Sequence, residues 1–329
     1  MKNSSKLKKP LITFIIPHRP EEKTDAVIEF IKKSCKKFKW EIICVTGNQP
    51  SKQRNIAGFK AKGEYIYFLD NDSILGKNSV NVALSHLIKD PNIAIIGGPS
   101  LTPSSDSFNQ KIFGIILSSF FAVGPYIRSR YSMVGEFRKA NEYNLILCNM
   151  IVRTSVFKKL KGFDEDMYPN EENVFINRVI KEGWKVYYEP SMVVFRSQRK
   201  NIFEFIIQLF TYGRGRSEQL IKQPFTFSFL HLLPIFFTIY VLLIPIFFLF
   251  FKILLLPLYI YILLNMFVSI AVAIYYKIFL LFPVFMALFF CVHFFYGLGI
   301  VTGFLKTLFY FKKNKKKKIF CRIDYVITK

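Results

Sequence analysis

The stretch Tyr65-Ile66-Tyr67-Phe68-Leu69-Asp70-Asn71-Asp72 indicates both a fold class and the position of a site. Its first five residues are apolar or aromatic, which is typical of a strand buried in a sheet. Side chains two residues apart on an extended backbone lie on the same side, so Asp70 and Asp72 can converge on one cation. Open α/β sheets bind ligands at this carboxyl edge. An acidic turn without a ligand is the alternative for this motif taken alone.

The chemistry of two carboxylates favours a hard cation. A site with one or two carboxylates and otherwise open positions suits Mg²⁺ or Mn²⁺ carrying a diphosphate, whose charge the ion neutralises. The motif therefore predicts a divalent metal at Asp70 and Asp72 and a nucleotide-sugar donor beside it.

The segments around this strand predict an α/β domain with a Rossmann-like, mostly parallel sheet and flanking helices. Apolar runs and helical spacing place the elements along the chain. Strands are expected at residues 11–16, 41–45, 65–69, 93–96 and 143–152, and helices at residues 21–37, 53–62, 79–89 and 171–182. Residues 112–123 are apolar but short, so we expect a membrane-surface helix or a flexible acceptor loop there.

Three long apolar stretches follow, at residues 225–251, 253–276 and 278–305, and they predict C-terminal transmembrane α-helices. Each reaches the roughly 20 residues that a helix needs to cross hydrocarbon. Only Lys252 and Lys277 interrupt them, so buried helices of a soluble core are a poor alternative. The expected organisation is a catalytic domain at 1–200, an amphipathic interfacial segment at 201–224, membrane helices at 225–309 and a basic tail at 310–329.

The net charge of +24 and the lysines at 312–318 leave two interpretations. A basic nucleic-acid arm is one. Lysines directly after an apolar span instead fit the positive-inside rule, so we expect a multi-pass protein of the cell (inner or cytoplasmic) membrane, with a cytoplasmic catalytic domain and no nucleic-acid partner. A cytoplasmic tail requires an even number of crossings, whereas three segments are apolar. One segment is then re-entrant or interfacial, or the tail lies outside.

The N-terminus and the cysteines agree with a cytoplasmic compartment. The apolar run at 11–16 is too short for a signal peptide, because it breaks at Pro17. The five cysteines show no C-x-x-C pairing and no zinc spacing, which favours a reducing environment.

A second acidic pair, Glu171-Glu172, begins a predicted helix with Asn170 as its N-cap. Favourable interaction with the helix dipole explains this pair on its own. Taken together with the other motifs, in this order, the chain resembles family 2 glycosyltransferases of the GT-A fold, membrane-anchored bacterial and archaeal type, from about residue 11 to residue 216. The motifs are Ile16-Pro17, Gln53-Arg54-Asn55, Gly63-Glu64-Tyr65-Ile66, Phe68-Leu69-Asp70-Asn71-Asp72, Asn149-Met150, Gly162-Phe163-Asp164-Glu165, Glu171-Glu172, and Arg178 with Gly183.

The resemblance implies roles for these residues. Asp72 is expected to contact the metal, with Asp70 near the ribose or the waters of the metal. Glu172 is expected to be the general base and Glu171 its support. Donor-binding residues are then expected to include Pro17, Arg54, Asp70, Asn149, Arg214 and Arg216, the last two on an interfacial helix beside the diphosphate. Positive charge at the edge of a membrane span is the alternative for these two arginines.

Two departures from the family pattern leave the donor open. The second strand is followed by Val45-Thr46-Gly47-Asn48, where the family commonly has an Asp near the base or ribose, so Thr46 or Asn48 is expected to substitute. The base position holds Glu172 rather than Asp. His18 is expected to be a solvent-exposed loop histidine.

The expected function is inverting transfer of a sugar, by a single displacement, from a nucleotide sugar to a lipid-linked or cell-envelope polysaccharide acceptor. A UDP-sugar is the first candidate for the donor. The alternative is a non-catalytic membrane scaffold or binding subunit that keeps the fold without the chemistry.

Overall fold

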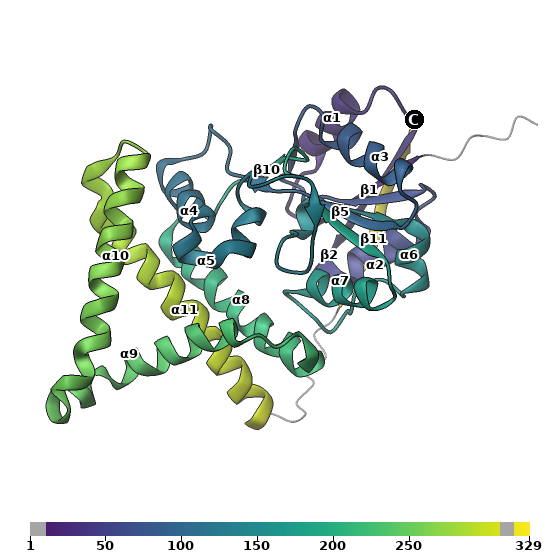
Figure 1. Ribbon diagram of the computed structural model, residues 1–329. Coiled ribbons are helices and arrows are strands. Elements are labelled where there is room, and N and C mark those ends of the chain that lie inside the picture. The colour runs from purple at the N-terminus through teal and green to yellow at the C-terminus, as the bar shows by residue number, and fades with distance from the viewer. Residues whose placement is uncertain (1–10, 310–318) are drawn as a thin grey trace, which may run out of the picture. The chain divides into compact units, whose positions relative to one another are not determined.

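The computed structural model describes residues 11–309 and 319–329 and divides into two units (Figure 1). The sheet unit comprises residues 1–106, 125–197 and 315–329, and the helical unit comprises residues 107–124 and 198–314. The lysine run at 312–318 lies outside the described residues.

The sheet unit has an eight-stranded sheet in the order β11-β2-β1-β3-β8-β5-β9-β7. These strands are β11 (Cys321–Thr328), β2 (Trp40–Gly47), β1 (Ile12–His18), β3 (Tyr65–Phe68), β8 (Met150–Arg153), β5 (Ile93–Gly97), β9 (Lys185–Tyr188) and β7 (Arg138–Lys139). β2, β1 and β3 are parallel, as are β5 and β9, whereas the other neighbours pair antiparallel. The α/β class is confirmed, but the sheet is mixed rather than mostly parallel, because β8 enters antiparallel between β3 and β5.

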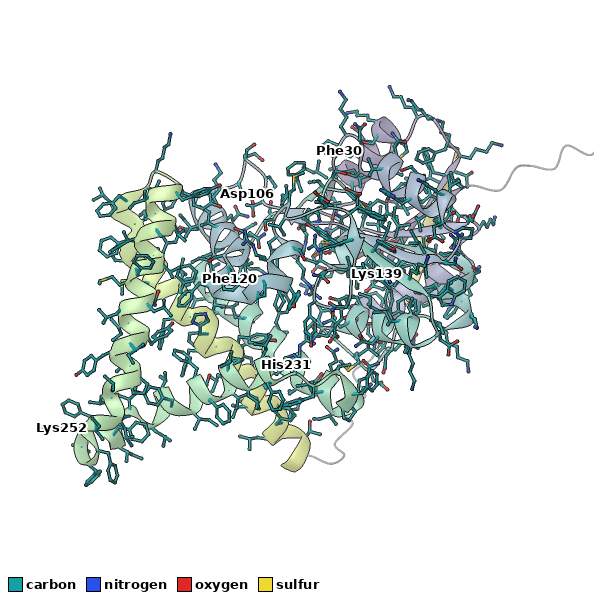
Figure 2. All side chains as sticks on the ribbon, in the orientation of Figure 1. Phe30, Asp106, Phe120, Lys139, His231 and Lys252 are labelled. Carbon is teal, nitrogen blue, oxygen red and sulfur yellow. The ribbon has the colours of Figure 1, made fainter. Side chains whose placement is uncertain are left out.

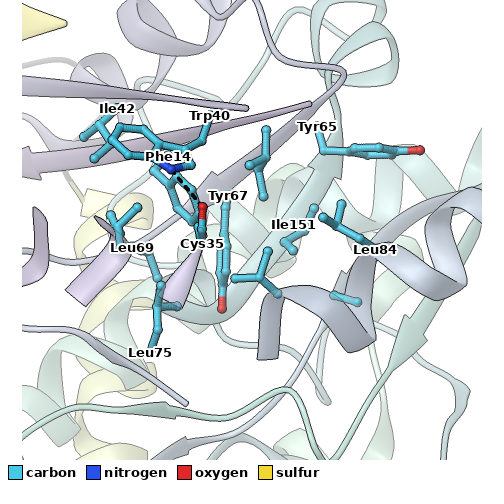
Figure 3. Packing of buried hydrophobic residues seen from close by; sticks show 14 of the residues in the cluster. Phe14, Cys35, Trp40, Ile42, Tyr65, Tyr67, Leu69, Leu75, Leu84 and Ile151 are labelled. Carbon is cyan, nitrogen blue, oxygen red and sulfur yellow. Dashed lines mark hydrogen bonds between the residues drawn. The ribbon is translucent and has the colours of Figure 1, made fainter. Parts of the chain in front are cut away.

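Helices cover both faces of this sheet. α1 (Asp25–Ser34) and α3 (Ser79–Lys89) bury their apolar sides in one core, and α2 (Pro50–Lys60), α6 (Thr154–Lys159) and α7 (Glu171–Lys181) bury theirs in the other. β3 serves both cores by alternation: Tyr65 and Tyr67 face the first (Figure 3), and Ile66 and Phe68 face the second. This two-sided burial explains the continuous apolar run of β3 and fixes Asp70 just beyond its end.

A small second sheet lies beside the acidic motif. It contains β4 (Ile74–Leu75), β10 (Val194–Phe195) and β6 (Ser100–Leu101) in the order β4-β10-β6. β10 pairs antiparallel with β4 and parallel with β6. Because β4 begins two residues after Asp72, this pairing brings the chain around residue 196 to the acidic motif.

Strand β11 was not anticipated from the sequence, which assigned no strand to the stretch 310–329. β11 pairs antiparallel with β2, with Cys321 opposite Gly47 and Thr328 opposite Glu41. Ile327 packs against one core and Ile323 against the other. The expected strand at 143–152 is also shorter, since residues 147–149 form a 3₁₀ turn before β8.

The helical unit contains α4 (Phe108–Ser118), α8 (Ile202–Lys222), α9 (Leu232–Phe250), α10 (Leu256–Tyr275) and α11 (Phe282–Phe309). Residues 112–123, expected as a membrane-surface helix or a flexible acceptor loop, fall on α4 and α5 (Phe120–Ile127), and the helical stretches Phe108–Ser118 and Phe120–Arg130 meet at a 56° bend. Short 3₁₀ helices lie at Arg128–Arg130, Leu147–Asn149, Pro224–Thr226, Phe229–His231, Lys252–Leu255 and Phe279–Leu281.

Within the described residues, three helical segments are long and apolar enough to cross a membrane, namely Phe229–Phe250, Lys252–Tyr275 and Phe279–Thr307, and the bent pair Phe108–Ser118 and Phe120–Arg130 makes a fourth if it forms one span. The side chains around Lys252, at the turn between the first two, are almost entirely hydrocarbon (Figure 2). Glycines allow α8 and α11 to approach closely: a Cβ on Gly213 would lie 2.0 Å from the Tyr296 carbonyl oxygen, and one on Gly299 would lie 2.1 Å from that of Phe210. Such small-residue contacts are typical of packed membrane helices.

Candidate functional site

The carboxylates of Asp70 and Asp72 lie close together, and both contact the guanidinium of Arg196. Arg196 Nε lies 3.2 Å from Asp70 Oδ2 and 3.2 Å from Asp72 Oδ1. Asp70 is 21% exposed at its side chain and Asp72 is 47% exposed. Partial burial and the neighbouring Asp70 carboxylate raise the pKa of Asp72, and Arg196 opposes this rise.

Local folding explains why Arg196 reaches this pair. β10 ends at Phe195, which lies opposite Ile74 of β4, and the Arg196 backbone N–H donates to Leu101 O at 2.9 Å. Arg196 therefore leaves the small sheet beside the turn that carries Asp72. The turn itself is closed by Ser73, whose backbone N–H donates to Asp70 O at 3.1 Å.

Arg54 connects this acidic motif to the second one. Its Nη2 donates to Asp70 Oδ1 at 3.0 Å and its Nη1 donates to Glu171 Oε1 at 2.9 Å. The Arg54 side chain is only 8% exposed and that of Glu171 only 3%. Arg54 Nε is buried and has no hydrogen-bond partner among the described residues. The two acidic motifs, about 100 positions apart in the sequence, thus form one ionic cluster, which is buried at Arg54 and Glu171 and partly exposed at Asp70 and Asp72.

The neighbours of Arg54 on α2 hold the surrounding loops. Gln53 Nε2 donates to His18 O at 2.9 Å and to Val45 O at 2.7 Å, which ties the ends of β1 and β2 together. Asn55 pairs with the backbone of Phe163 in both directions, at 2.9 and 2.8 Å. The motif Gln53-Arg54-Asn55 therefore positions three parts of the site from a single helix.

Glu171 and Glu172 occupy the first turn of α7, as predicted. Asn170 stands at the N-cap position, but it adopts a left-handed conformation (φ 81°) and its side chain makes no capping hydrogen bond. Burial raises the pKa of Glu171 to about 7; Arg54 opposes this rise and the Glu172 carboxylate adds to it. Two adjacent buried carboxylates therefore lie at the N-terminal end of α7, where the helix dipole is positive.

Glu172 faces an arginine that the sequence analysis did not select. Arg130 Nη1 lies 3.7 Å from Glu172 Oε1, and Arg130 Nη2 donates to Asn173 Oδ1 at 2.7 Å. Arg130 Nε also donates to the Tyr143 carbonyl at 3.1 Å, so its guanidinium is held in place. The sequence shows only a group of basic residues at 128–138, which does not indicate that Arg130 is the one that reaches the site.

The remaining predicted donor-binding residues lie in different surroundings. Pro17 is buried near the end of β1, opposite Val45. Asn149 is fully buried: it accepts from Tyr67 Oη at 2.6 Å and donates to the carbonyls of Pro99 and Met192 at 2.8 and 2.6 Å. These bonds give Asn149 a bracing role, and its contact with a donor stays a prediction.

Arg214 and Arg216 belong to α8 of the helical unit. Arg214 Nε lies 3.5 Å from Glu218 Oε1, and the buried Arg216 donates from Nη1 to Gln219 Oε1 at 2.9 Å. Each arginine thus has an acceptor within its own helix. Their expected contact with a diphosphate stays a prediction.

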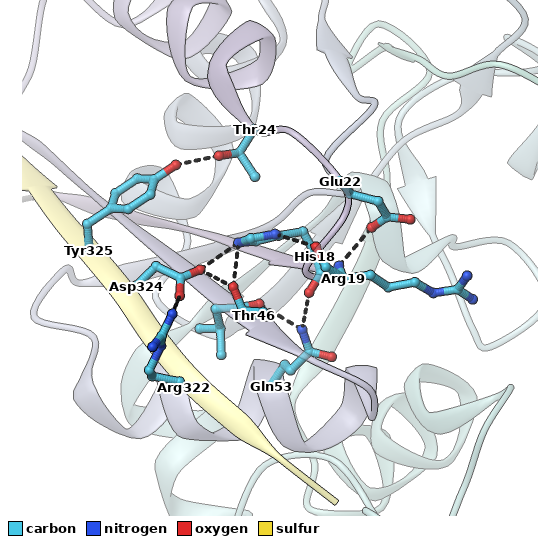
Figure 4. A network of polar contacts seen from close by, with 10 residues as sticks. His18, Arg19, Glu22, Thr24, Thr46, Gln53, Arg322, Asp324 and Tyr325 are labelled. Atoms are coloured by element: carbon cyan, nitrogen blue, oxygen red, sulfur yellow. Dashed lines mark hydrogen bonds and ion pairs between the residues drawn. The ribbon is translucent and has the colours of Figure 1, made fainter.

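His18 differs from its expectation as an exposed loop residue. Its side chain is only 9% exposed, and Nε2 lies 2.7 Å from Asp324 Oδ2 of β11 (Figure 4). The sequence could not indicate this partner, since 306 positions separate the two residues. The strand itself had a readable signal, because residues 323–328 are rich in β-branched and aromatic side chains.

The donor set tests whether a divalent metal fits the acidic motif. Within residues 11–309 and 319–329, no group of three or more His, Cys, Asp or Glu side chains could hold a metal ion. Asp70 and Asp72 nevertheless face one cation, Arg196, in a half-exposed position. Two carboxylates that leave the other ligands to phosphates and water suit Mg²⁺ or Mn²⁺. The residues therefore fit a substrate-dependent metal.

Arg54 gives a stability prediction for this cluster. We expect Arg54→Met to lower the free energy of unfolding by about 3 kcal/mol or more, because it leaves the buried Glu171 carboxylate without its cation. Thermal melting of the detergent-purified protein measures the loss. The double variant Arg54→Met/Glu171→Gln should recover much of it, since no unpaired charge remains. A double variant as unstable as the single one would show that packing of Arg54, and not its charge, is responsible.

Comparison with known families places the chain. The model of the glycosyl transferase family group 2 matches residues 65–298, well over half of the chain, so the protein belongs to this family. The match begins at β3, includes both acidic motifs and continues into the apolar helices. The family agrees with the fold class expected from the sequence, a GT-A α/β domain followed by apolar helices.

Several individual proteins are similar to the chain. A dolichyl N-acetyl-alpha-D-glucosaminyl phosphate 3-beta-D-2,3-diacetamido-2,3-dideoxy-beta-D-glucuronosyltransferase of Methanococcus voltae is 25% identical over 216 residues, which cover 63% of this chain and 64% of that protein. A pre-mycofactocin glycosyltransferase of Mycobacterium tuberculosis is 24% identical over 179 residues, 53% of this chain and 36% of its own. The chain thus spans less than two thirds of these relatives.

Among solved structures, the mannosyltransferase PcManGT from Pyrobaculum calidifontis, in complex with GDP-Man and Mn²⁺, aligns with a TM-score of 0.44 and 12% identity. The alignment covers 68% of this chain and 66% of that one.

Proposed function

We propose that the protein is a membrane-bound inverting glycosyltransferase that moves a sugar from a nucleotide-sugar donor to a lipid-linked or cell-envelope polysaccharide acceptor. The observation that carries this proposal is the bridge from Asp70 through Arg54 to Glu171. It joins a pair of carboxylates suited to a metal diphosphate with a second carboxylate pair that can take a proton. Both pairs lie in the sheet unit.

Glu172 is the proposed general base. It accepts the proton of an acceptor hydroxyl while the oxygen attacks the anomeric carbon and the bond from that carbon to the diphosphate breaks. The anomeric configuration is inverted, and the nucleoside diphosphate leaves with the bond's electron pair. Arg130, whose Nη1 lies 3.7 Å from Glu172 Oε1, is proposed to orient this carboxylate.

Asp70 and Asp72 would hold Mg²⁺ or Mn²⁺, which when bound neutralises charge on the leaving diphosphate. Arg196 lies beside both carboxylates and is proposed to contact the diphosphate, because arginine is well suited to phosphate. The unpaired Nε of Arg54 offers one more donor at the same place. A UDP-sugar is our first candidate for the donor. Arg214 and Arg216 of α8 are proposed to contribute on the diphosphate side.

A lipid-linked acceptor is supported by the apolar helices and by the relative that is named for a dolichyl phosphate sugar. The deciding experiment is a thermal-shift screen of the full-length protein in detergent against UDP-, GDP-, dTDP- and CMP-sugars, with and without Mn²⁺. We expect one metal-dependent stabilisation, because a ligand that binds only the folded state raises its melting temperature. No shift with any nucleotide sugar would favour the non-catalytic scaffold.

The membrane topology follows from chain connectivity. The segment 198–314 leaves the sheet unit after residue 197 and returns to it, because β11 pairs with β2 of the same sheet. Both ends of the segment must therefore lie on one side of a membrane, and we infer an even number of crossings. The three apolar segments cannot all be complete spans, so one of them is re-entrant or interfacial. The proposed side is the cytoplasm.

Green fluorescent protein fused separately to Met1 and to Lys329 tests this topology in intact cells. We expect fluorescence from both fusions, because the fluorophore matures when the fusion stays in the cytoplasm. A parallel pair of alkaline phosphatase fusions should be inactive at both ends. Opposite results at the two ends would mean an odd number of crossings and would contradict the pairing of β11 with β2.

A further inference from the structure

The C-terminal strand brings a carboxylate to the ligand-binding edge of the sheet. Asp324 lies on β11, at the irregularity of its pairing with β2 between Ile323 and Tyr325. Asp324 Oδ2 lies 2.7 Å from His18 Nε2, and it also accepts the hydroxyl hydrogen of Thr46 (Figure 4). His18 and Thr46 are at the carboxyl ends of the parallel strands β1 and β2. Three strands thus contribute one polar cluster.

Gly47 leaves the space that the start of β11 occupies. A Cβ on Gly47 would lie 2.7 Å from the Phe320 carbonyl oxygen and 2.9 Å from the Gln53 side chain. Any larger residue would force the start of β11 or α2 to move. Gln53 also holds the cluster, because its Nε2 donates to the backbone carbonyls of His18 and Val45. Asp324 is therefore placed by backbone pairing and not by a mobile tail.

Asp324 is anionic in this position. Burial opposes ionisation, but hydrogen bonds from Thr46 and His18 outweigh it and lower the pKa of Asp324. Its side chain is 15% exposed, so the carboxylate retains access to a ligand. Arg322 Nη2 lies 3.4 Å from the other oxygen, Oδ1, and is itself 81% exposed. This arginine can move into solvent and leave Oδ1 to a ligand.

The sheet order relates this cluster to the acidic motif. Going from β3, which ends two residues before Asp70, the next strands are β1 and β2, both parallel to β3. At about 4.8 Å per strand, β2 lies roughly 10 Å from β3. That distance suits a nucleotide whose diphosphate lies at the acidic motif and whose ribose and base extend along the carboxyl edge of the sheet towards β2. The opposite neighbour of β3 is the antiparallel β8, which presents the buried Met150 there.

We propose that Asp324 of the C-terminal strand recognises the base of the nucleotide donor by accepting a base N–H. This proposal rests on the proposed function. Uracil presents an N–H at N3 and guanine presents N–H groups at N1 and N2, whereas cytosine and adenine present an unprotonated ring nitrogen at the corresponding position. A carboxylate discriminates between these classes, since an acceptor facing an acceptor is left unpaired. The residue that selects the nucleotide base would then follow the membrane helices in the chain.

The test is calorimetric titration of the full-length protein in detergent with Mn²⁺ and UDP, GDP, CDP, ADP or pyrophosphate. The wild type should prefer UDP or GDP to CDP and ADP. Asp324→Asn keeps the shape of the side chain but offers an amide, so we expect the favoured nucleotide to bind roughly ten- to hundred-fold more weakly. Pyrophosphate binding should be unchanged, because it depends on Asp70 and Asp72.

Tyr325→Phe is the matched control. It removes from the same strand a hydroxyl group that hydrogen-bonds to Thr24, and it leaves every carboxylate in place. It should keep the base preference. An Asp324→Asn protein that keeps the wild-type preference would overturn the proposal, as would one that loses pyrophosphate and nucleotide equally. A wild type that binds no nucleotide would overturn the proposed function itself, and this assignment with it. The two failures are therefore distinguishable.

Discussion

Glu172→Gln should reduce sugar transfer by roughly 10²- to 10⁴-fold, the usual contribution of a general base. Glutamine keeps the size of the side chain and its place in the first turn of α7, but it cannot take the proton of the acceptor hydroxyl. Donor binding should persist, because the acidic motif and Arg54 are untouched. Turnover with a saturating nucleotide sugar, measured beside donor affinity by titration, separates the two effects.

Glu182→Gln is the matched control for this change. Glu182 follows the same helix, is 47% exposed and pairs with Lys159 at 3.3 Å, so its neutralisation should leave turnover unaltered. Near-normal transfer by Glu172→Gln would remove Glu172 as the base. Equal loss of donor binding and turnover would indicate that Glu172 shapes the donor site instead.

Asp72→Asn should lower metal-dependent turnover by at least about 10²-fold, since one of two carboxylates available to the cation is lost. Asp72 is a cleaner test than Asp70, because Asp70 also holds Arg54. The dependence of the rate on Mn²⁺ concentration should shift to higher concentrations in the variant. The fold should survive, as the Asp72 side chain is 47% exposed.

Asp166→Asn supplies the control for loss of one acidic charge, because Asp166 is exposed in the sheet unit. It should leave the metal dependence unaltered. A fully active Asp72→Asn protein with the wild-type metal dependence would show that Arg196 alone supplies the positive charge at this motif. Activity that persists in both the Asp72→Asn and the Asp166→Asn protein after a chelator has removed the metal would likewise show that Arg196 alone supplies the positive charge.

The sequence predicted well wherever the signal was local. The apolar run of β3 followed by Asp70 and Asp72 shows alternate burial and a turn, and both features depend on neighbours within a few residues. The expected helix at 79–89 agrees with α3, and the acidic start of α7 was recognised for the same reason. The three apolar segments were equally readable, because the length of a span in hydrocarbon is a property of the segment itself.

Tertiary structure decided the partners. Arg196 meets Asp72 only because β10 pairs with β4, and Arg54 joins Asp70 to Glu171 only because α2 and α7 pack in the same core of the sheet. Asp324 reaches His18 across 306 positions because β2 offers an unpaired edge that β11 fills. Periodicity and capping act over one or two turns of chain, so they determine the elements of this protein. The choice of which edge or side chain an element meets depends on burial of the whole sheet, which only the folded chain provides.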